Sequence, residues 1–290
     1  MPPFTRSFFL LVAASVLTRL MLQPFTTALS LTSRYELSSP MTSSSRVAEG
    51  VHLLALQHDP YATDLVHLPP WFLSLSRALL QISLPSVPQI GLLILYALAD
   101  AAVVVSLCFI HHSLHAAPLP TLTAVKLCFN PLALLSCLAL TSSSLYHALL
   151  FGSVALASAA QLPMMPSLLL LAAAASMDFR AATILPVVLA MRSRVAAPAP
   201  SSAPSSAASP SGRAQVLRAV FHVLSFVLCY GALFLLDVLL LAGPPHSTHA
   251  SFFARFQSGG AAVWQAVPMF DLQVRELVPT IGTAWYMMME

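Results

Sequence analysis

The chain has 290 residues, of which 58% are hydrophobic and only 8% are charged, and its formal net charge is +3. Soluble domains carry about 25% charged residues, so this sequence has too little polar surface to cover a water-soluble globule. We therefore expect an all-α, polytopic membrane protein. The basic residues say little about partners, because in membrane proteins they chiefly set orientation. No nucleic-acid partner is expected.

Residues 1–25 are expected to form the first transmembrane helix. Arg19 interrupts their apolar run and no clean cleavage site of small residues follows, so we predict an uncleaved anchor and not a signal peptide. An arginine in lipid costs roughly 2.5–3.5 kcal/mol. Its side chain should therefore extend to an interface, contact a lipid phosphate or pair with a carboxylate. The candidate carboxylates are Glu36, Asp100 and Asp178.

Residues 26–86 are expected to form a lumenal loop that follows the first helix. The segment R-V-A-E-G within it has a helical pattern, in which Arg46 and Glu49 are spaced (i, i+3) and can pair. Gly50 is the predicted C-cap of this helix. Polar groups held at a membrane face often mark a functional surface.

The second half of this loop combines a turn with a further helix. D-P-Y at residues 59–61 is a turn signature. Residues 71–84 have apolar side chains at helical spacing, with Arg77 on the other side. They predict a short helix in the membrane interface, with Trp71 at the level of the headgroups.

Residues 87–191 are expected to hold further transmembrane helices and a broken hairpin. Three spans are predicted before the hairpin, at 87–110, 125–140 and 145–161. Asn130-Pro131 opens or kinks the second of these, because proline lacks the N–H that a helix needs. The break is either a structural kink or the end of a half-helix that contacts a polar ligand group.

The predicted hairpin consists of two apolar runs, at 165–175 and 181–190, broken around Asp178 and Arg180. Each run gives about 15 Å of helix, too short to cross a core of about 30 Å. Arginines crowd the segment that follows, which the positive-inside rule assigns to the cytosol. With a cytosolic N-terminus, only a hairpin returns the chain to that side, with Asp178 and Arg180 paired at its tip.

The remaining sequence is expected to form a linker and one further membrane region. Residues 192–214 are rich in Ala, Pro and Ser and predict a disordered cytosolic linker. Residues 215–290 begin with a clear span at 215–242. The sequence then stops inside an aromatic and Met-rich run, which suggests truncation.

Metal and cofactor chemistry finds little support in the sequence. His111, His112 and His115 form H-H-x-x-H, in which His112 and His115 share a helix face, but no carboxylate or cysteine lies nearby. The four cysteines lie within apolar runs, as small buried residues do. We predict no metal, no cofactor and no catalytic residue.

Three ordered blocks of the sequence resemble the PIG-U family, a multi-spanning subunit of the GPI transamidase. The matching residues are Ser39-Pro40, Ser43, Arg46-Val47, Glu49-Gly50, Pro60-Tyr61, His67 and Pro69, then Phe129-Asn130-Pro131 with Leu135-Ser136-Cys137, and finally Pro279, Ile281-Gly282 and Trp285-Tyr286. Thr280 departs from the asparagine that the family often has there. The chain resembles the N-terminal two thirds of such proteins.

The resemblance implies a membrane architecture like that of GT-C glycosyltransferases, and a multi-pass protein of the endoplasmic reticulum membrane. It implies a non-catalytic subunit that binds or presents the GPI lipid and organises the complex, with catalysis in a separate polypeptide. The other transamidase subunits and the GPI glycolipid are the expected partners. The candidate contact residues for lipid or partners are Arg46, Glu49, Asp59, Tyr61, Asn130 and Trp285.

Two alternatives stay open at this stage. GPI mannosyltransferases, which use dolichol-phosphate mannose, share the architecture but need carboxylates early in the first lumenal loop. Here that stretch holds only Glu36 and no D-x-D pair. A transporter would fit the broken helices, but no inverted repeat is visible.

Overall fold

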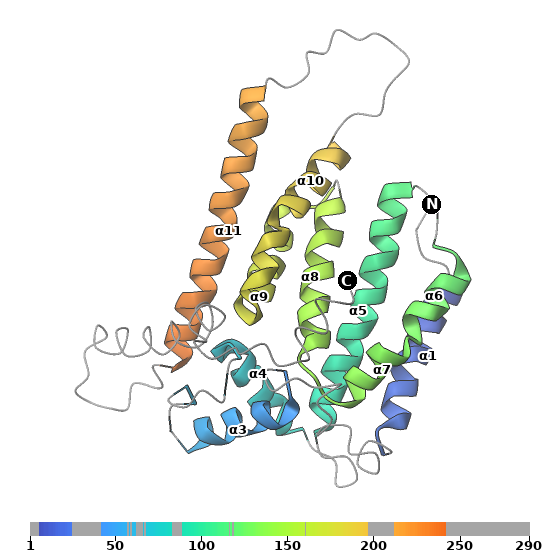
Figure 1. Ribbon diagram of the computed structural model, residues 1–290, viewed down its shortest axis with the longest axis vertical. Coiled ribbons are helices and arrows are strands. Elements are labelled where there is room, and N and C mark those ends of the chain that lie inside the picture. Colours follow the sequence, from blue (N-terminus) through green and yellow to red (C-terminus); the bar gives the residue numbers. More distant parts are fainter. Residues whose placement is uncertain are drawn as a thin grey trace, which may run out of the picture.

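The computed structural model describes residues 6–24, 42–56, 58, 60–61, 66, 68–82, 89–115, 117, 119–159, 161–196 and 212–241. Every regular element in these segments is helical (Figure 1). In chain order they are α1 (Arg6–Leu22), α3 (Ser44–Ala55), α4 (Pro70–Leu80), α5 (Ile90–His115), α6 (Thr121–Cys128), α7 (Pro131–Leu138), α8 (Ser143–Ser158), α9 (Met164–Met177), the 3-10 helix η2 (Phe179–Ile184), α10 (Leu185–Ala196) and α11 (Gly212–Leu241).

Three stretches of the described chain are long and apolar enough to cross a membrane, namely α5, the α6–α7 stretch and most of α11. The predicted all-α membrane class is therefore confirmed. The first and fourth predicted spans form α1 and α8, which have 17 and 16 residues. These two helices are shorter than the roughly 20 residues that a straight span needs.

The third predicted span is two helices, because the chain breaks at Asn130-Pro131. α6 ends at Cys128 and α7 begins at Pro131, with eight residues in each. Proline is favoured at the first position of a helix, where its missing N–H has no partner to lose. The predicted break is therefore present, and it lies at the start of α7.

The predicted hairpin is also present, as α9, η2 and α10 (Figure 1). Arg192 of α10 donates from Nη1 to the carbonyl of Ala159, at the end of α8, over 2.7 Å. The chain therefore returns to the level at which α9 began. The second arm differs from the prediction, because its first turns are 3-10 and α10 begins only at Leu185. At the tip, Arg180 Nε lies 3.2 Å from Asp178 Oδ1.

The helices that flank the predicted linker are longer than expected. α10 continues to Ala196, and α11 begins at Gly212. The predicted linker, at 192–214, therefore includes helical residues at both of its ends. Its middle, residues 197–211, lies outside the described residues.

Apolar side chains form two main core clusters. One joins α4, the first half of α5 and α7 around Phe72, Leu93 and Tyr96. The other joins α8, α9, α10 and α11 around Leu168 and Leu171. The hairpin thus packs between α8 and α11, while α1 and α6 pack on the far side of α5 (Figure 1).

The bundle has two distinct ends. At the first, called the loop end, lie α3, α4, the hairpin tip at Asp178 and the end of α11 (Figure 1). At the second, called the Arg-rich end, α8 and α10 end and α11 begins, with Arg192 and Arg218.

The two helices of the loop, α3 and α4, end at other residues than the sequence predicted. Gly50 is not a C-cap, because α3 continues to Ala55. A Cβ on Gly50 would lie 3.1 Å from a methyl group of Leu73 and 3.1 Å from one of Val66, so this glycine lets α3 pack closely on α4 and the preceding segment. The predicted interfacial helix is α4, which ends at Leu80, and its Arg77 is exposed as expected.

Candidate functional site

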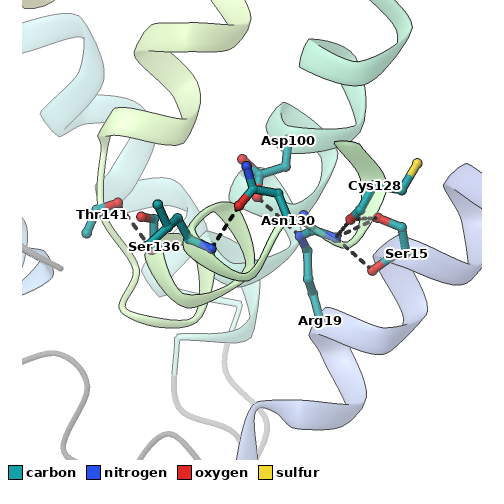
Figure 2. A network of polar contacts seen from close by, with 8 residues as sticks. Ser15, Arg19, Asp100, Cys128, Asn130, Ser136 and Thr141 are labelled. Carbon is teal, nitrogen blue, oxygen red and sulfur yellow. Dashed lines mark hydrogen bonds and ion pairs between the residues drawn. The ribbon is translucent and has the colours of Figure 1, made fainter. Parts of the chain in front are cut away.

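Arg19, the arginine that interrupts the first helix, is buried within the bundle (Figure 2). Its Nε lies 3.1 Å from Oδ2 of Asp100 on α5, and their side chains are 1% and 9% exposed. Of the partners considered from the sequence, Asp100 is the one that the structure shows. An ion inside the bundle needs such a partner, because desolvation alone would cost several kcal/mol.

The helix break at Asn130 supplies a second acceptor for the same guanidinium. α6 ends at Cys128, so the carbonyl there has no partner further along the helix. This carbonyl accepts from Arg19 Nη1 over 3.1 Å and from the hydroxyl of Ser15 over 3.2 Å. Arg19 also donates to the carbonyl oxygen and the hydroxyl of Ser15. The Cys128 carbonyl, which the helix break leaves free, thus accepts a hydrogen bond that the buried Arg19 guanidinium needs to donate (Figure 2).

Further polar groups surround this ion pair. Ser144 at the start of α8 and the ring of His147 also lie close to the Asp100 carboxylate. The site therefore ties together α1, α5, the α6–α7 break and α8. Its geometry is that of an internal clamp, with the charges directed at each other.

Asn130 has a structural role and an exposed position. Its side-chain oxygen accepts from the backbone N–H of Leu132 over 3.0 Å, so it caps the N-terminus of α7. The residue is exposed, and its amide NH2 points away from that cap bond (Figure 2). Asn130 can therefore contact a group outside the chain while it holds the helix start.

Arg46 and Glu49 form the ion pair that their spacing predicted. Arg46 Nη1 lies 2.8 Å from Glu49 Oε2, and the side chains are 33% and 39% exposed. The hydroxyl of Ser43 caps the same helix, because it accepts from the backbone N–H of Arg46. This pair is the half-exposed, polar surface of α3 at the loop end.

The other candidate residues behave differently. Tyr61 is buried, and its hydroxyl donates to the carbonyl of Leu68 over 2.7 Å, so its ring and hydroxyl hold the loop together. Asp59 and Trp285 lie outside the described residues, as does Glu36.

One contact at the loop end has no signal in the sequence. Asp237, near the end of α11, accepts from the backbone N–H of Trp71 over 2.7 Å. α4 starts at Pro70, and no side chain from its own N-cap residue makes a cap bond. Asp237 therefore caps α4 from 166 residues away. The indole Nε1 of Trp71 donates to the hydroxyl of Ser176 on α9 over 2.9 Å, so this side chain packs against α9.

The histidine motif and the cysteines form no metal centre within the described part of the chain. The rings of His111 and His115 lie together, with centroids 4.7 Å apart, whereas the sequence pattern had paired His112 with His115. All four cysteines are buried and free, as predicted.

A family model described as GPI transamidase subunit PIG-U matches residues 13–290. The chain belongs to the PIG-U family. No curated protein matches it. Because the match covers nearly the whole chain, the resemblance first seen in three short blocks extends across the helices, the loop and the region beyond α11.

Membership makes this chain a membrane-spanning subunit of the GPI transamidase. Each described carboxylate has a partner inside the chain. Asp100 pairs with Arg19, Asp178 with Arg180 and Glu49 with Arg46, while Asp237 accepts from a backbone amide. Asp100 and Asp237 therefore join different helices, whereas Glu49 and Asp178 make local contacts.

Proposed function

We propose that this chain is a non-catalytic subunit of the GPI transamidase in the endoplasmic reticulum membrane. It binds or presents the GPI glycolipid and helps to organise the other subunits. The observation that carries the proposal is the PIG-U family match over residues 13–290. Transfer of a protein to GPI is then performed by a separate polypeptide of the same complex.

The carboxylates support the non-catalytic part of this proposal. A general base needs a carboxylate that can reach its substrate. Asp100 is buried against Arg19, and Asp237 is buried against the N-terminus of α4. Both are committed to structural contacts, and Glu49 and Asp178 each face an arginine.

Two polar surfaces support the lipid-handling part, namely the pair on α3 at the loop end and Asn130 at the α6–α7 junction. Arg46, Glu49 and Asn130 are the candidate contacts, because each keeps part of its side chain exposed. A guanidinium binds phosphate through several N–H donors, and carboxylate and amide groups bind sugar hydroxyls. A GPI lipid offers both kinds of group.

One backbone contact connects these two surfaces. The N–H of Ser142, between α7 and α8, donates to the carbonyl of Thr42, directly before α3, over 3.0 Å. The start of the helix that carries Arg46 and Glu49 is thereby joined to the segment that follows α7. We propose that Asp59 and Trp285 extend this surface, whereas Tyr61 supports it from inside.

The decisive experiment is the lipid profile of cells that lack the chain. The proposal predicts that complete, mannosylated GPI lipid and uncleaved precursor proteins accumulate, and that re-expression removes both. Mannose-poor GPI precursors would contradict the proposal, because they would indicate a mannosyltransferase. Glu36→Gln provides the matched variant: it should keep GPI attachment if the chain is a non-catalytic subunit, and abolish sugar transfer if it is that enzyme.

A further inference from the structure

The Arg-rich end carries two arginines and a histidine, which come from two helices. Arg218 and His222 are four residues apart on α11, so they lie on the same side of that helix. Arg192 lies on α10, whose neighbouring Met191 belongs to the same core cluster as Phe226 of α11. Arg192 and Arg218 are both close enough to His222 for their charges to act on its ring.

One member of this cluster is held in place by the fold. Arg192 Nη1 donates to the carbonyl of Ala159 at the end of α8, over 2.7 Å, and the side chain is half-buried. A guanidinium has five N–H donors in a fixed plane. The bond to Ala159 therefore fixes the orientation of Arg192 and leaves most of its donors for another acceptor. Arg218, on α11, is exposed.

No described carboxylate neutralises Arg192 or Arg218. Glu49, Asp178 and Asp237 lie at the loop end, and Asp100 pairs with Arg19 on α1. The three ion pairs found among the described residues include neither Arg192 nor Arg218. Holding like charges together is unfavourable unless an anion comes between them.

The surface beside the cations is apolar. Leu217, Val220, Phe221 and Leu224 of α11 are 69%, 50%, 64% and 57% exposed, directly around Arg218 and His222. An anion with hydrocarbon chains can therefore place its charge on the arginines and its chains along α11. A free anion such as phosphate would use only the first of these contacts.

We propose that Arg192, Arg218 and His222 form a binding site for the phosphate headgroup of an anionic phospholipid, at the membrane surface where α8 and α10 end and α11 begins. The positive-inside rule places this end in the cytosol, and the cytosolic leaflet is the one rich in anionic lipids. The site is separate from the loop-end surface and does not depend on the GPI-handling role.

The test uses the full chain, in its assembled complex, in bilayers of phosphatidylcholine. Electron spin resonance of spin-labelled phosphatidylserine and phosphatidylcholine measures which lipid the protein retains. We expect preferential retention of phosphatidylserine, reduced about fivefold by each of Arg192→Gln and Arg218→Gln, since one arginine near the surface contributes about 1 kcal/mol. Arg77→Gln is the matched control, because Arg77 is an exposed arginine at the loop end.

Salt dependence and competition by a soluble headgroup provide two further tests. Raising the salt concentration should weaken the preference, and soluble glycerophosphoserine should not abolish it, because the chains contribute to binding. If Arg192→Gln disturbs packing at Ala159, the result for Arg218→Gln alone decides the test, because the Arg218 side chain is exposed. Equal retention of both lipids by the native chain, or an unchanged preference in Arg218→Gln, would overturn the proposal.

Discussion

The two ends of the helical bundle use their charged residues differently. At the loop end, Glu49, Asp178 and Asp237 each contact a donor within the chain. At the Arg-rich end, no described carboxylate pairs with Arg192 or Arg218. The loop end thus satisfies its carboxylates with donors inside the chain, whereas the Arg-rich end presents charge to the membrane surface.

This difference has a consequence for mutations. Removing one member of a buried contact leaves the other without its partner, so changes at Arg19, Asp100 or Asp237 should act first on folding. Removing an unpaired surface arginine leaves no such partner behind. Changes at the Arg-rich end should therefore act on lipid retention with the fold intact.

The largest effect is expected at the buried pair between α1 and α5. Asp100→Ala leaves Arg19 charged and buried without its carboxylate, so it should destabilise the fold by about 3–5 kcal/mol. Thermal unfolding of the purified chain in detergent measures this loss.

The matched control for this pair replaces both charges by apolar side chains. Arg19→Met combined with Asp100→Leu should recover most of the lost stability, because no unpaired charge remains. A double variant as unstable as Asp100→Ala would show that the other hydrogen bonds of Arg19, to Ser15 and Cys128, carry the stability instead.

The next largest effect is expected where α4 crosses the start of α5. A Cβ on Gly91 would collide with the backbone carbonyl of Leu79, which cannot move as a flexible side chain can. Gly91→Ala should therefore cost about 1–3 kcal/mol, the range for overpacked sites. Gly231→Ala is the control, because nothing lies within 4 Å of its added Cβ. Equal thermal stability of the two variants would contradict the close approach of α4 and α5.

A smaller effect is expected at the cap between α11 and α4. Asp237→Ala removes the acceptor for the N–H of Trp71, and losing a cap costs about 0.5–2 kcal/mol. Asp237→Asn keeps a side-chain oxygen and should lose less. Hydrogen exchange of the α4 amides provides the readout, with faster exchange expected in Asp237→Ala than in Asp237→Asn. Identical exchange in both variants and the native chain would rule out the cap.

The smallest effect on stability is expected at the half-exposed pair on α3. Arg46→Ala or Glu49→Ala should each cost only about 0.3–0.5 kcal/mol. Cell-surface display of a GPI-anchored reporter, measured at equal expression, then separates folding from function. A large loss of display is expected, since the pair is a candidate contact for the lipid or a partner. Normal display in both variants would limit the pair to its structural role.

Local signals in the sequence predicted the breaks and the pairs. Proline fixes where α7 begins, and charged residues in apolar runs fix the hairpin tip at Asp178 and Arg180. The cost of burying Arg19 restricted its partner to a few carboxylates, one of which is Asp100. These features depend on neighbouring residues or on one large energetic cost, that of burying a charge. They can therefore be predicted from the sequence before the fold is known.

Contacts between distant segments could not be predicted in this way. Gly50 has the local signature of a C-cap, but methyl groups of Val66 and Leu73 require a glycine inside a longer helix. Asp237 and Trp71 are 166 residues apart, and nothing in either segment points to the other. An amphipathic helix such as α4 has the same pattern whether its apolar face meets lipid or protein.

The most direct test of the account is to ask where the GPI lipid touches the complex. A photoactivatable GPI lipid is added to membranes that contain the assembled transamidase, and the cross-linked peptides are identified by mass spectrometry. We predict labelling of α3 around Arg46 and Glu49, or of the α6–α7 junction at Asn130. Exchanging the charges, as Arg46→Glu with Glu49→Arg, keeps an ion pair and should lower that labelling. Cross-links confined to the other subunits, with this chain present and assembled, would contradict the account.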